Sequence, residues 1–158
     1  MTNYALEKRF AELGVEFVRA KVGDRYVLEQ LKAREGWIFG GESSGHLLVL
    51  DCQTTGDGIV SSLQVLAAMR RQNKSLAELP ADITLMPQVL INKRIEKGFD
   101  WKALQPMIDA VKEAEDKLTG RGRVLIRPSG TEPLLRIMVE ADDKALAQTL
   151  AQKIADTL

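Results

Sequence analysis

The stretch RPSGTEP, Arg127 to Pro133, lies between two apolar runs, VLI at 124–126 and LLRIMV at 134–139. Short apolar runs on either side of a link that contains glycine and proline predict two β-strands joined as an antiparallel hairpin. An Asn-Gly or Asp-Gly pair would close such a hairpin with fewer residues. Because this link carries a guanidinium, two hydroxyls and a glycine, we interpret it as an anion-binding loop.

The elements around this hairpin predict a small α+β domain. A strand is expected over 83–95, a helix over 100–118 and a second, amphipathic helix from Asp142 to the chain end. With the hairpin the order is βαββα, which is typical of an α+β domain with an antiparallel sheet. We expect this domain to begin near residues 79–82.

The first half of the chain predicts an α/β layer arrangement, because helices alternate with short apolar runs. The expected elements are a helix up to Gly14, a strand at 15–20 (VEFVRA), a helix over 24–34, strands IFGGE and LLVLD around SSGH, and a helix from Gly56 capped by Thr54 or Thr55. A doubly wound domain normally opens with a strand, whereas this half opens with a helix. We therefore expect the chain to be a C-terminal piece of something longer.

The amino-acid composition limits the classes of protein to which this chain can belong. The 158 residues are 45% hydrophobic and 28% charged, as in soluble globular proteins, and no apolar run approaches the ~20 residues that span a bilayer. The N-terminus lacks the features of a signal peptide, so we expect a cytoplasmic protein without a membrane partner. A net charge of zero argues against nucleic acid as a partner. The single cysteine, Cys52, is expected in a strand and cannot form an internal disulfide. One cysteine and one histidine are too few ligands for a zinc site.

The RPSGTEP loop has the donors that a phosphate needs. The guanidinium of Arg127 matches two phosphate oxygens, and Ser129 and Thr131 add hydroxyl donors. Gly130 tolerates a positive φ, which would let neighbouring backbone N–H groups converge on an anion. The two prolines restrict the loop, so that less conformational entropy is lost when it binds.

Glu132 does not fit a phosphate site by itself, since its carboxylate would repel the anion unless it points away or holds Arg127 or Arg136. A second interpretation of the loop is a hairpin turn whose serine and threonine satisfy backbone groups. From the residues alone both interpretations stay open.

Two further loops carry chemistry. GGESSGH (40–46) contains Glu42, Ser44 and His46 among three glycines, and a carboxylate beside a hydroxyl suits the vicinal hydroxyls of a sugar. AKVGDRY (20–26) places Lys21 at an expected strand end, where a lysine can neutralise a phosphate or act as an acid or base. The alternatives are a flexible glycine turn and a solvated surface lysine.

Together these loops resemble the α-D-phosphohexomutase superfamily. The sugar loop of that superfamily follows GExSGH, and its phosphate loop follows RxSGTEP; both patterns occur here, at 41–46 and 127–133. KVGDRYV (21–27) and TTGDG (54–58) are similar to the branch that acts on glucosamine phosphate. The resemblance covers nearly the whole chain, as the C-terminal third or so of such an enzyme.

The resemblance implies a partial α/β domain followed by a complete α+β domain. Residues 1–79 would be the C-terminal part of the third α/β domain, with the sugar-binding loop. Residues 80–158 would be the phosphate-binding C-terminal domain, an α+β fold with an antiparallel sheet similar to that of the TATA-binding protein. In the whole enzyme these two would join two further domains around a central cleft.

The resemblance also implies a reaction, in which glucosamine 6-phosphate becomes glucosamine 1-phosphate through a bisphosphorylated sugar. A phosphoserine and Mg²⁺ would take part in this reaction. Its product would serve the synthesis of UDP-N-acetylglucosamine and of peptidoglycan precursors. The partners would be the hexosamine phosphate and the upstream domains. The implied site residues are Glu42, Ser44 and His46 for the sugar, Arg127, Ser129, Gly130 and Thr131 for the phosphate, and Lys21 and His46 as auxiliary catalytic candidates.

The superfamily's phosphoserine segment, SHNP, and its metal loop, DGDxDR, do not occur in this sequence. We therefore expect that the chain alone has no mutase activity and binds no Mg²⁺. Two alternatives remain: a phosphomannomutase or phosphoglucomutase of the same superfamily, and a non-catalytic phosphosugar-binding module. A nucleic-acid-binding domain, suggested by the TATA-binding-protein-like topology, would lack a basic face.

Overall fold

The computed structural model describes residues 1–96 and 98–158. The chain divides into two compact units, Met1–Thr84 and Leu85–Leu158. The boundary expected near residues 79–82 lies a few residues before this division. No helix in the described part of the chain has the length and apolar character that crossing a membrane requires.

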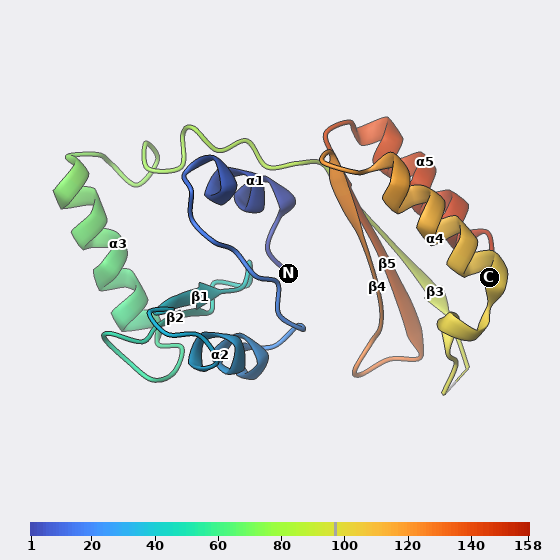
Figure 1. Cartoon of the computed structure of the whole chain (residues 1–158), viewed down its shortest axis with the longest axis horizontal. Coiled ribbons are helices and arrows are strands. Elements are labelled where there is room, and N and C mark those ends of the chain that lie inside the picture. Colours follow the sequence, from blue (N-terminus) through green and yellow to red (C-terminus); the bar gives the residue numbers. More distant parts are fainter. Residues whose placement is uncertain (97) are drawn as a thin grey trace. The chain divides into compact units, whose positions relative to one another are not determined.

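The C-terminal unit has the βαββα order predicted from sequence (Figure 1). Its elements are β3 (Gln88–Arg94), a short 3₁₀ helix (Trp101–Ala103), α4 (Gln105–Lys117), β4 (Gly122–Pro128), β5 (Leu134–Ala141) and α5 (Lys144–Ala155). The strands form one antiparallel sheet in the order β3-β5-β4. The α+β fold with an antiparallel sheet is therefore confirmed.

Two element boundaries in this unit differ from those expected, and each lies at a proline. The helix predicted over 100–118 is interrupted at Leu104, because Pro106 has no N–H to donate and is accommodated in the first turn of α4. The strand predicted from residue 83 begins only at Gln88, directly after Pro87. A proline cannot donate to the ladder, which explains why regular pairing starts after it.

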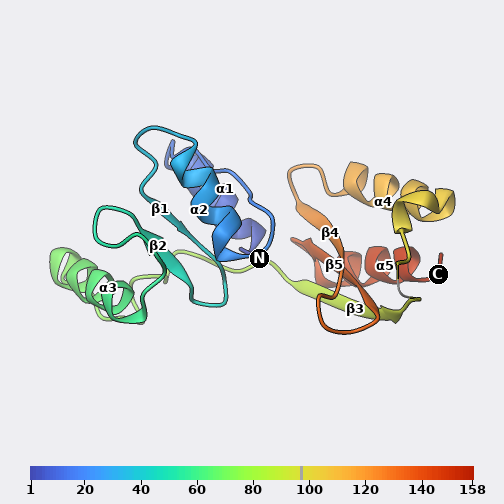
Figure 2. The same cartoon turned by 90° about the horizontal axis from the view of Figure 1, so that it is seen from below.

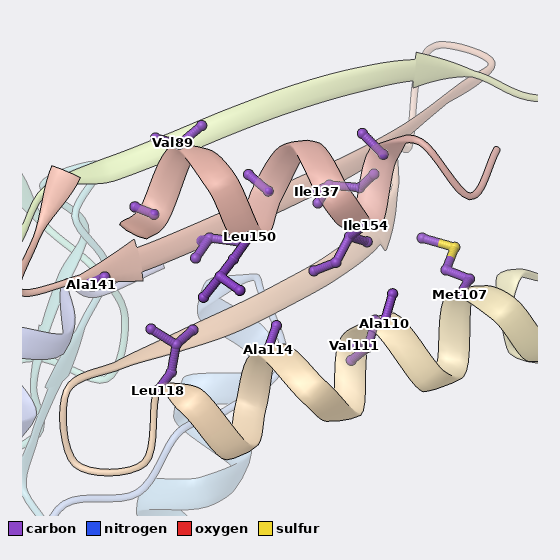
Figure 3. Packing of buried hydrophobic residues seen from close by; sticks show 14 of the residues in the cluster. Val89, Met107, Ala110, Val111, Ala114, Leu118, Ile137, Ala141, Leu150 and Ile154 are labelled. Atoms are coloured by element: carbon purple, nitrogen blue, oxygen red, sulfur yellow. The ribbon is translucent and has the colours of Figure 1, made fainter. Parts of the chain in front are cut away.

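One face of the sheet packs on α4 and α5 and forms the core (Figure 3). Alternate residues of β5, namely Leu135, Ile137 and Val139, are completely buried on this face. The facing stripe of α5 contains the buried alanines Ala147, Ala151 and Ala155. Small side chains let the helix approach the sheet closely, so the central strand β5 is fixed by packing along most of its length.

The opposite face of the sheet carries charge. In the register of β4 and β5, Arg123 lies opposite Glu140 and Arg127 lies opposite Arg136. Arg123 Nε donates to Glu140 Oε2 at 2.7 Å, and Glu140 is completely buried. The hairpin predicted from RPSGTEP thus presents its arginines on the face away from the helices.

The N-terminal unit is built around a short hairpin. Its elements are α1 (Tyr4–Glu12), α2 (Asp24–Lys32), β1 (Phe39–Gly41), β2 (Leu47–Val49) and α3 (Gly58–Gln72). β1 and β2 pair antiparallel, and the hairpin contacts α2 through β1 and α3 through β2 (Figure 2). This hairpin brings the GGESSGH turn close to the starts of α2 and α3.

The strand predicted at 15–20 is wrong, because these residues belong to no ladder in the structure. Val15 N donates back to Phe10 O at 2.8 Å, and the Phe17 ring stacks on the Phe10 ring with centroids 5.7 Å apart. β-branched and aromatic residues favour extended backbone, but a strand also needs a neighbouring strand with which to pair. In the described part of this unit the two strands pair with each other.

Two expectations around β2 and α3 are also wrong. Asp57, rather than Thr54 or Thr55, caps α3, since its carboxylate accepts from Ile59 N at 2.8 Å and Val60 N at 3.0 Å. Cys52 is exposed in a turn rather than placed in a strand, because the chain reverses after Val49 and Cys52 N donates to Val49 O.

The two units differ in how much apolar surface they bury. In the described residues, Leu31 and Leu48 are the buried hydrophobic residues of Met1–Thr84, whereas the C-terminal unit buries sixteen. Helix α3 carries Ile59, Leu63 and Leu66 at helical spacing, and they are 76, 58 and 54% exposed. Burial drives folding, so we expect the C-terminal unit to be the more stable of the two.

The first prediction tests the core of the C-terminal unit. Ile137→Ala should lower its free energy of unfolding by ~2–5 kcal/mol, because it leaves a cavity beneath α4 and α5. The matched control is Leu85→Ala, whose side chain is 62% exposed, and which should change stability by less than ~0.5 kcal/mol. Urea titrations followed by the NMR signals of β5 amides measure both. Equal losses in the two variants would contradict the assignment of the core.

The second prediction concerns acid. Hydrogen bonds from Lys117 and from Lys153 to the Glu113 carboxylate lower the pKa of Glu113 from 4.5 to about 2. A carboxyl group whose pKa is lower in the folded than in the unfolded protein stabilises the folded protein at a pH above its unfolded-state pKa. This stabilisation disappears as the pH falls through the folded-state pKa. Glu113→Gln should therefore be less stable than the parent chain at pH 7, with the difference vanishing between pH 4.5 and about 2. Urea titrations across that range measure the difference, and a difference independent of pH would contradict the prediction.

Candidate functional site

The GGESSGH segment forms the turn between β1 and β2. Gly45 N donates to Glu42 O at 3.0 Å, and Glu42 N donates to His46 O at 2.9 Å. Gly45 has a φ of 88°, which side chains other than glycine rarely adopt. Ser44 is exposed at the tip of this turn. The three predicted sugar-binding residues therefore lie in one turn of a short hairpin.

Glu42 joins this turn to the KVGDR loop that precedes α2. Its Oε1 accepts a hydrogen bond from Gly23 N at 3.0 Å, and the side chain is 16% exposed. Glu42 Oε1 also lies 3.7 Å from the Met1 amino nitrogen, so a backbone donor and an ammonium group together hold this oxygen. Lys21 lies two residues before Gly23 and is exposed; its described contact is with the Tyr26 ring, whose centroid is 5.8 Å from Nζ.

His46 joins the same turn to the TTGDG loop that precedes α3. A Cβ at Gly56 would lie 2.2 Å from His46 Cδ2, so the absence of a side chain at Gly56 makes room for the imidazole. His46 Nε2 lies 3.9 Å from Asp24 Oδ2, beyond hydrogen-bond distance. The structure therefore brings Glu42 and His46 together with Gly23, Asp24 and Gly56, three residues that the sequence analysis did not assign to the site.

The RPSGTEP segment connects β4 to β5. Ser129 N donates to Leu134 O at 2.8 Å, and Leu134 N donates to Glu132 O at 2.8 Å, which closes the base of the loop. Gly130, Thr131 and Glu132 are exposed. The tip of the loop therefore presents backbone and a threonine hydroxyl to solvent, above the paired arginines of the sheet.

The expected role of Gly130 in this loop is wrong in one respect. Gly130 does not adopt a positive φ, and Ser129 N is already bonded, so consecutive amides do not form the predicted nest. A loop of this length reverses the chain without a left-handed residue. Instead, apart from its two chain neighbours, no described residue has an atom within 4 Å of the place where a Cβ at Gly130 would be, so the space beside the glycine is open.

Glu132 holds Arg136, which is one of the outcomes that the sequence left open. Glu132 Oε2 lies 3.5 Å from a terminal guanidinium nitrogen of Arg136, and that nitrogen also donates to Ser129 Oγ at 3.3 Å. Sequence reasoning did not place Arg136 among the phosphate-binding residues. The signal in the sequence was weak, because Arg127 lies four residues and Arg136 five residues from Thr131 in the middle of the loop, and only the register shows that they are partners.

A metal site does not form from the residues that the structure describes, since no three His, Cys, Asp or Glu side chains gather in an arrangement that could hold an ion. The acidic residues of the two loops act as partners of backbone or guanidinium donors instead. Arginine, hydroxyl and carboxylate groups of this kind can bind an anion and a polyol.

Comparison with known protein families gives two matches. Residues 1–85 match the family model described as phosphoglucomutase/phosphomannomutase, alpha/beta/alpha domain III, and residues 90–157 match that of the C-terminal domain. Curated relatives include the phosphoglucosamine mutases of Bordetella parapertussis and Ralstonia nicotianae, each 60% identical over the whole chain. The chain spans about a third of the length of these relatives, 35% in each case.

Solved structures share the fold at lower identity. An Aspergillus fumigatus N-acetylphosphoglucosamine mutase is 19% identical with a TM-score of 0.80 over 98% of this chain and 36% of its own. A structure of that enzyme in complex with GlcNAc-6P and magnesium gives 0.74 over 96% and 38%. A phosphoglucomutase/phosphomannomutase family protein from Burkholderia thailandensis is 21% identical, with a TM-score of 0.69 over 97% of this chain and 34% of its own.

The third prediction tests how His46 is held. Gly56→Ala should displace the imidazole, because the new methyl group would lie where the ring is now. Gly58→Ala is the matched control, since no atom lies within 4 Å of its Cβ position. His46 is the single histidine of the chain, so its ring signals in a ¹H–¹³C NMR spectrum report the change without ambiguity. Unchanged His46 signals in Gly56→Ala would contradict the described packing.

Proposed function

The chain belongs to the phosphoglucomutase/phosphomannomutase family, and from this membership we propose that it supplies sugar and phosphate recognition in a phosphoglucosamine mutase. Such an enzyme converts glucosamine 6-phosphate to glucosamine 1-phosphate through a bisphosphate, for UDP-N-acetylglucosamine synthesis. The observation that carries the proposal is the pair of loops, GESSGH with its held Glu42 and RPSGTEP with its opposed arginines. The 60% identity to phosphoglucosamine mutases favours glucosamine phosphate over mannose or glucose phosphate.

The RPSGTEP loop would bind the phosphate that is not being transferred. Arg127 offers a fork of N–H donors, and Ser129 and Thr131 offer hydroxyls, which together suit the oxygens of a phosphate monoester. Gly130 would let the phosphate approach the backbone, because the space beside it is open. None of these contacts depends on which carbon of the sugar carries the phosphate. The loop would therefore serve before and after the bisphosphate turns over.

The GESSGH turn would bind the sugar. Glu42 Oε1 is held by Gly23 N, so Oε2 would accept from ring hydroxyls, with Ser44 beside it at the exposed tip. Two neighbouring hydroxyls of a hexose look alike when the ring is reversed, so one carboxylate can read both orientations. His46 and Lys21 are proposed to move a proton or to offset charge at the reacting oxygen.

The remaining chemistry would come from other segments of the enzyme. A phosphoserine would donate its phosphoryl group to one hydroxyl and recover one from the other position, and Mg²⁺ would offset the charge that develops. The described residues do not fit a Mg²⁺ site, so no step here is assigned to the metal through this chain. The proposed partners are accordingly the hexosamine phosphate and the segments that carry the serine and the metal loop.

The fourth prediction separates recognition from turnover. The chain alone should not produce glucosamine 1-phosphate from glucosamine 6-phosphate. A chimera in which it replaces the matching third of the Bordetella relative should do so, and faster than it converts mannose or glucose 6-phosphate. Arg127→Gln in the chimera should lower kcat/KM about tenfold or more, because one charge-assisted bond of ~1.5–3 kcal/mol is lost.

Arg121→Gln is the control for that experiment, since it removes the same charge at the other end of β4, where Arg121 pairs with Asp142. It should leave kcat/KM within about twofold. An inactive chimera that folds, or one that prefers mannose or glucose phosphate, would count against the glucosamine assignment. Turnover by the chain alone would count against the proposed division of roles.

A further inference from the structure

The first two residues of the chain lie against the GGESSGH turn. Ser43 Oγ donates to Met1 O at 2.7 Å, and Thr2 Oγ1 donates to Gly41 O at 3.4 Å. The Met1 amino nitrogen lies 3.7 Å from Glu42 Oε1. Three successive residues of the turn, 41–43, therefore contact the Met1–Thr2 segment.

Arg19 holds the same segment. Its Nη1 donates to Thr2 O at 2.9 Å, its Nε donates to Glu7 Oε2 at 2.7 Å, and its guanidinium lies 5.3 Å from the centre of the Phe17 ring. Its Nη2 is buried and has no hydrogen-bond partner among the described residues, so this arginine is not a solvated surface charge. A planar guanidinium can bond two acceptors at once, and Arg19 thereby joins the Met1–Thr2 segment to α1.

The Glu42 carboxylate is connected to Arg19 by two routes. Arg19 lies four residues before Gly23, whose N donates to Glu42 Oε1 at 3.0 Å. The second route passes through the Met1–Thr2 segment and Ser43. Because few apolar side chains are buried in the described part of this unit, polar contacts of this kind decide where the carboxylate lies.

Ser43 acts on the turn without being a sugar ligand itself. It occupies the variable position of the GExSGH pattern, and its hydroxyl proton is used in the bond to Met1 O. The acceptors of Ser43 and of Arg19, Met1 O and Thr2 O, are backbone carbonyl groups, so neither bond depends on the side chains of the segment or on a free amino group. Both residues can therefore affect sugar binding without touching the sugar.

We propose that Arg19 and Ser43 are positioning residues for Glu42. They hold the Met1–Thr2 segment against the GGESSGH turn and so keep the Glu42 carboxylate in the place where the sugar hydroxyls would meet it. This assignment rests on the proposed function, because it concerns the turn that would bind the sugar. Loss of either contact leaves the carboxylate in place in a smaller fraction of molecules, which weakens the apparent affinity for the sugar by that fraction.

The fifth prediction uses hydrogen exchange of the Gly23 amide, which reports on its bond to Glu42 Oε1. In the 158-residue chain, Arg19→Gln and Ser43→Ala should each speed this exchange about fivefold or more, because each loses a hydrogen bond that holds the turn. Ser43→Thr keeps the hydroxyl and should restore the parent rate. Arg19→Lys offers one nitrogen for two acceptors and should not restore it.

Two variants in the same unit are matched controls. Arg34→Gln removes an arginine that also donates to a backbone carbonyl and lies over an aromatic ring, 5.1 Å from its centre. Ser62→Ala removes a hydroxyl that also donates to a backbone carbonyl, at 2.7 Å. Both should leave the Gly23 exchange rate within about twofold of the parent rate. The Leu31 amide of α2 should keep its rate in every variant, because a purely structural loss would raise exchange throughout the unit.

The chimera measures the effect on recognition. There, Arg19→Gln and Ser43→Ala should raise KM for glucosamine 6-phosphate about fivefold and change kcat by less than about twofold, as expected when binding is lost and the reacting groups stay. An unchanged KM, or Gly23 exchange that matches the parent or rises together with that of Leu31, would overturn the positioning role and leave the proposed function standing. An inactive chimera would count against the proposed function, while the exchange rates would still decide whether Arg19 and Ser43 hold Glu42.

Discussion

The register of β5 against β4 is the constraint on which the C-terminal unit depends. Leu135, Ile137 and Val139 are buried against α4 and α5, and the residues between them face the other way. A slip by one residue would turn these three to the opposite, charged face and bring Arg136 into an apolar core, which would leave a charge buried without a partner. Core packing therefore sets which residues lie on the charged face, and it places Arg127 opposite Arg136.

The two units hold their loops by different means. The RPSGTEP loop begins and ends in strands of a sheet whose central strand is buried, so core packing holds both of its ends. The GGESSGH turn depends on polar contacts between three loops, among them Gly23 N to Glu42 Oε1, and on the close approach of His46 to Gly56. With few buried apolar side chains beneath it, this turn depends on its hydrogen bonds for its geometry.

Sequence patterns predicted the secondary-structure elements better than they predicted which residues contact each other. The βαββα order and both hairpins follow from local signals, namely apolar runs, turn residues and helical spacing. The strand at 15–20 was wrong because pairing depends on a neighbour that no local pattern shows, and the opposition of Arg127 and Arg136 depends on a register that is fixed by loop length. The contact between Gly56 and His46 joins two loops that are ten residues apart in the sequence, and the spacing of the residues gives no signal for it.

The two glutamates of the loops illustrate how the partner of a carboxylate decides its use. Glu42 Oε1 accepts from Gly23 N and lies 3.7 Å from the Met1 amino nitrogen, so this carboxylate ties the GGESSGH turn to the loop before α2. Glu132 lies 3.5 Å from a terminal guanidinium nitrogen of Arg136, in an ion pair between partly exposed side chains. The same residue type therefore orders a backbone loop in one unit and an arginine side chain in the other.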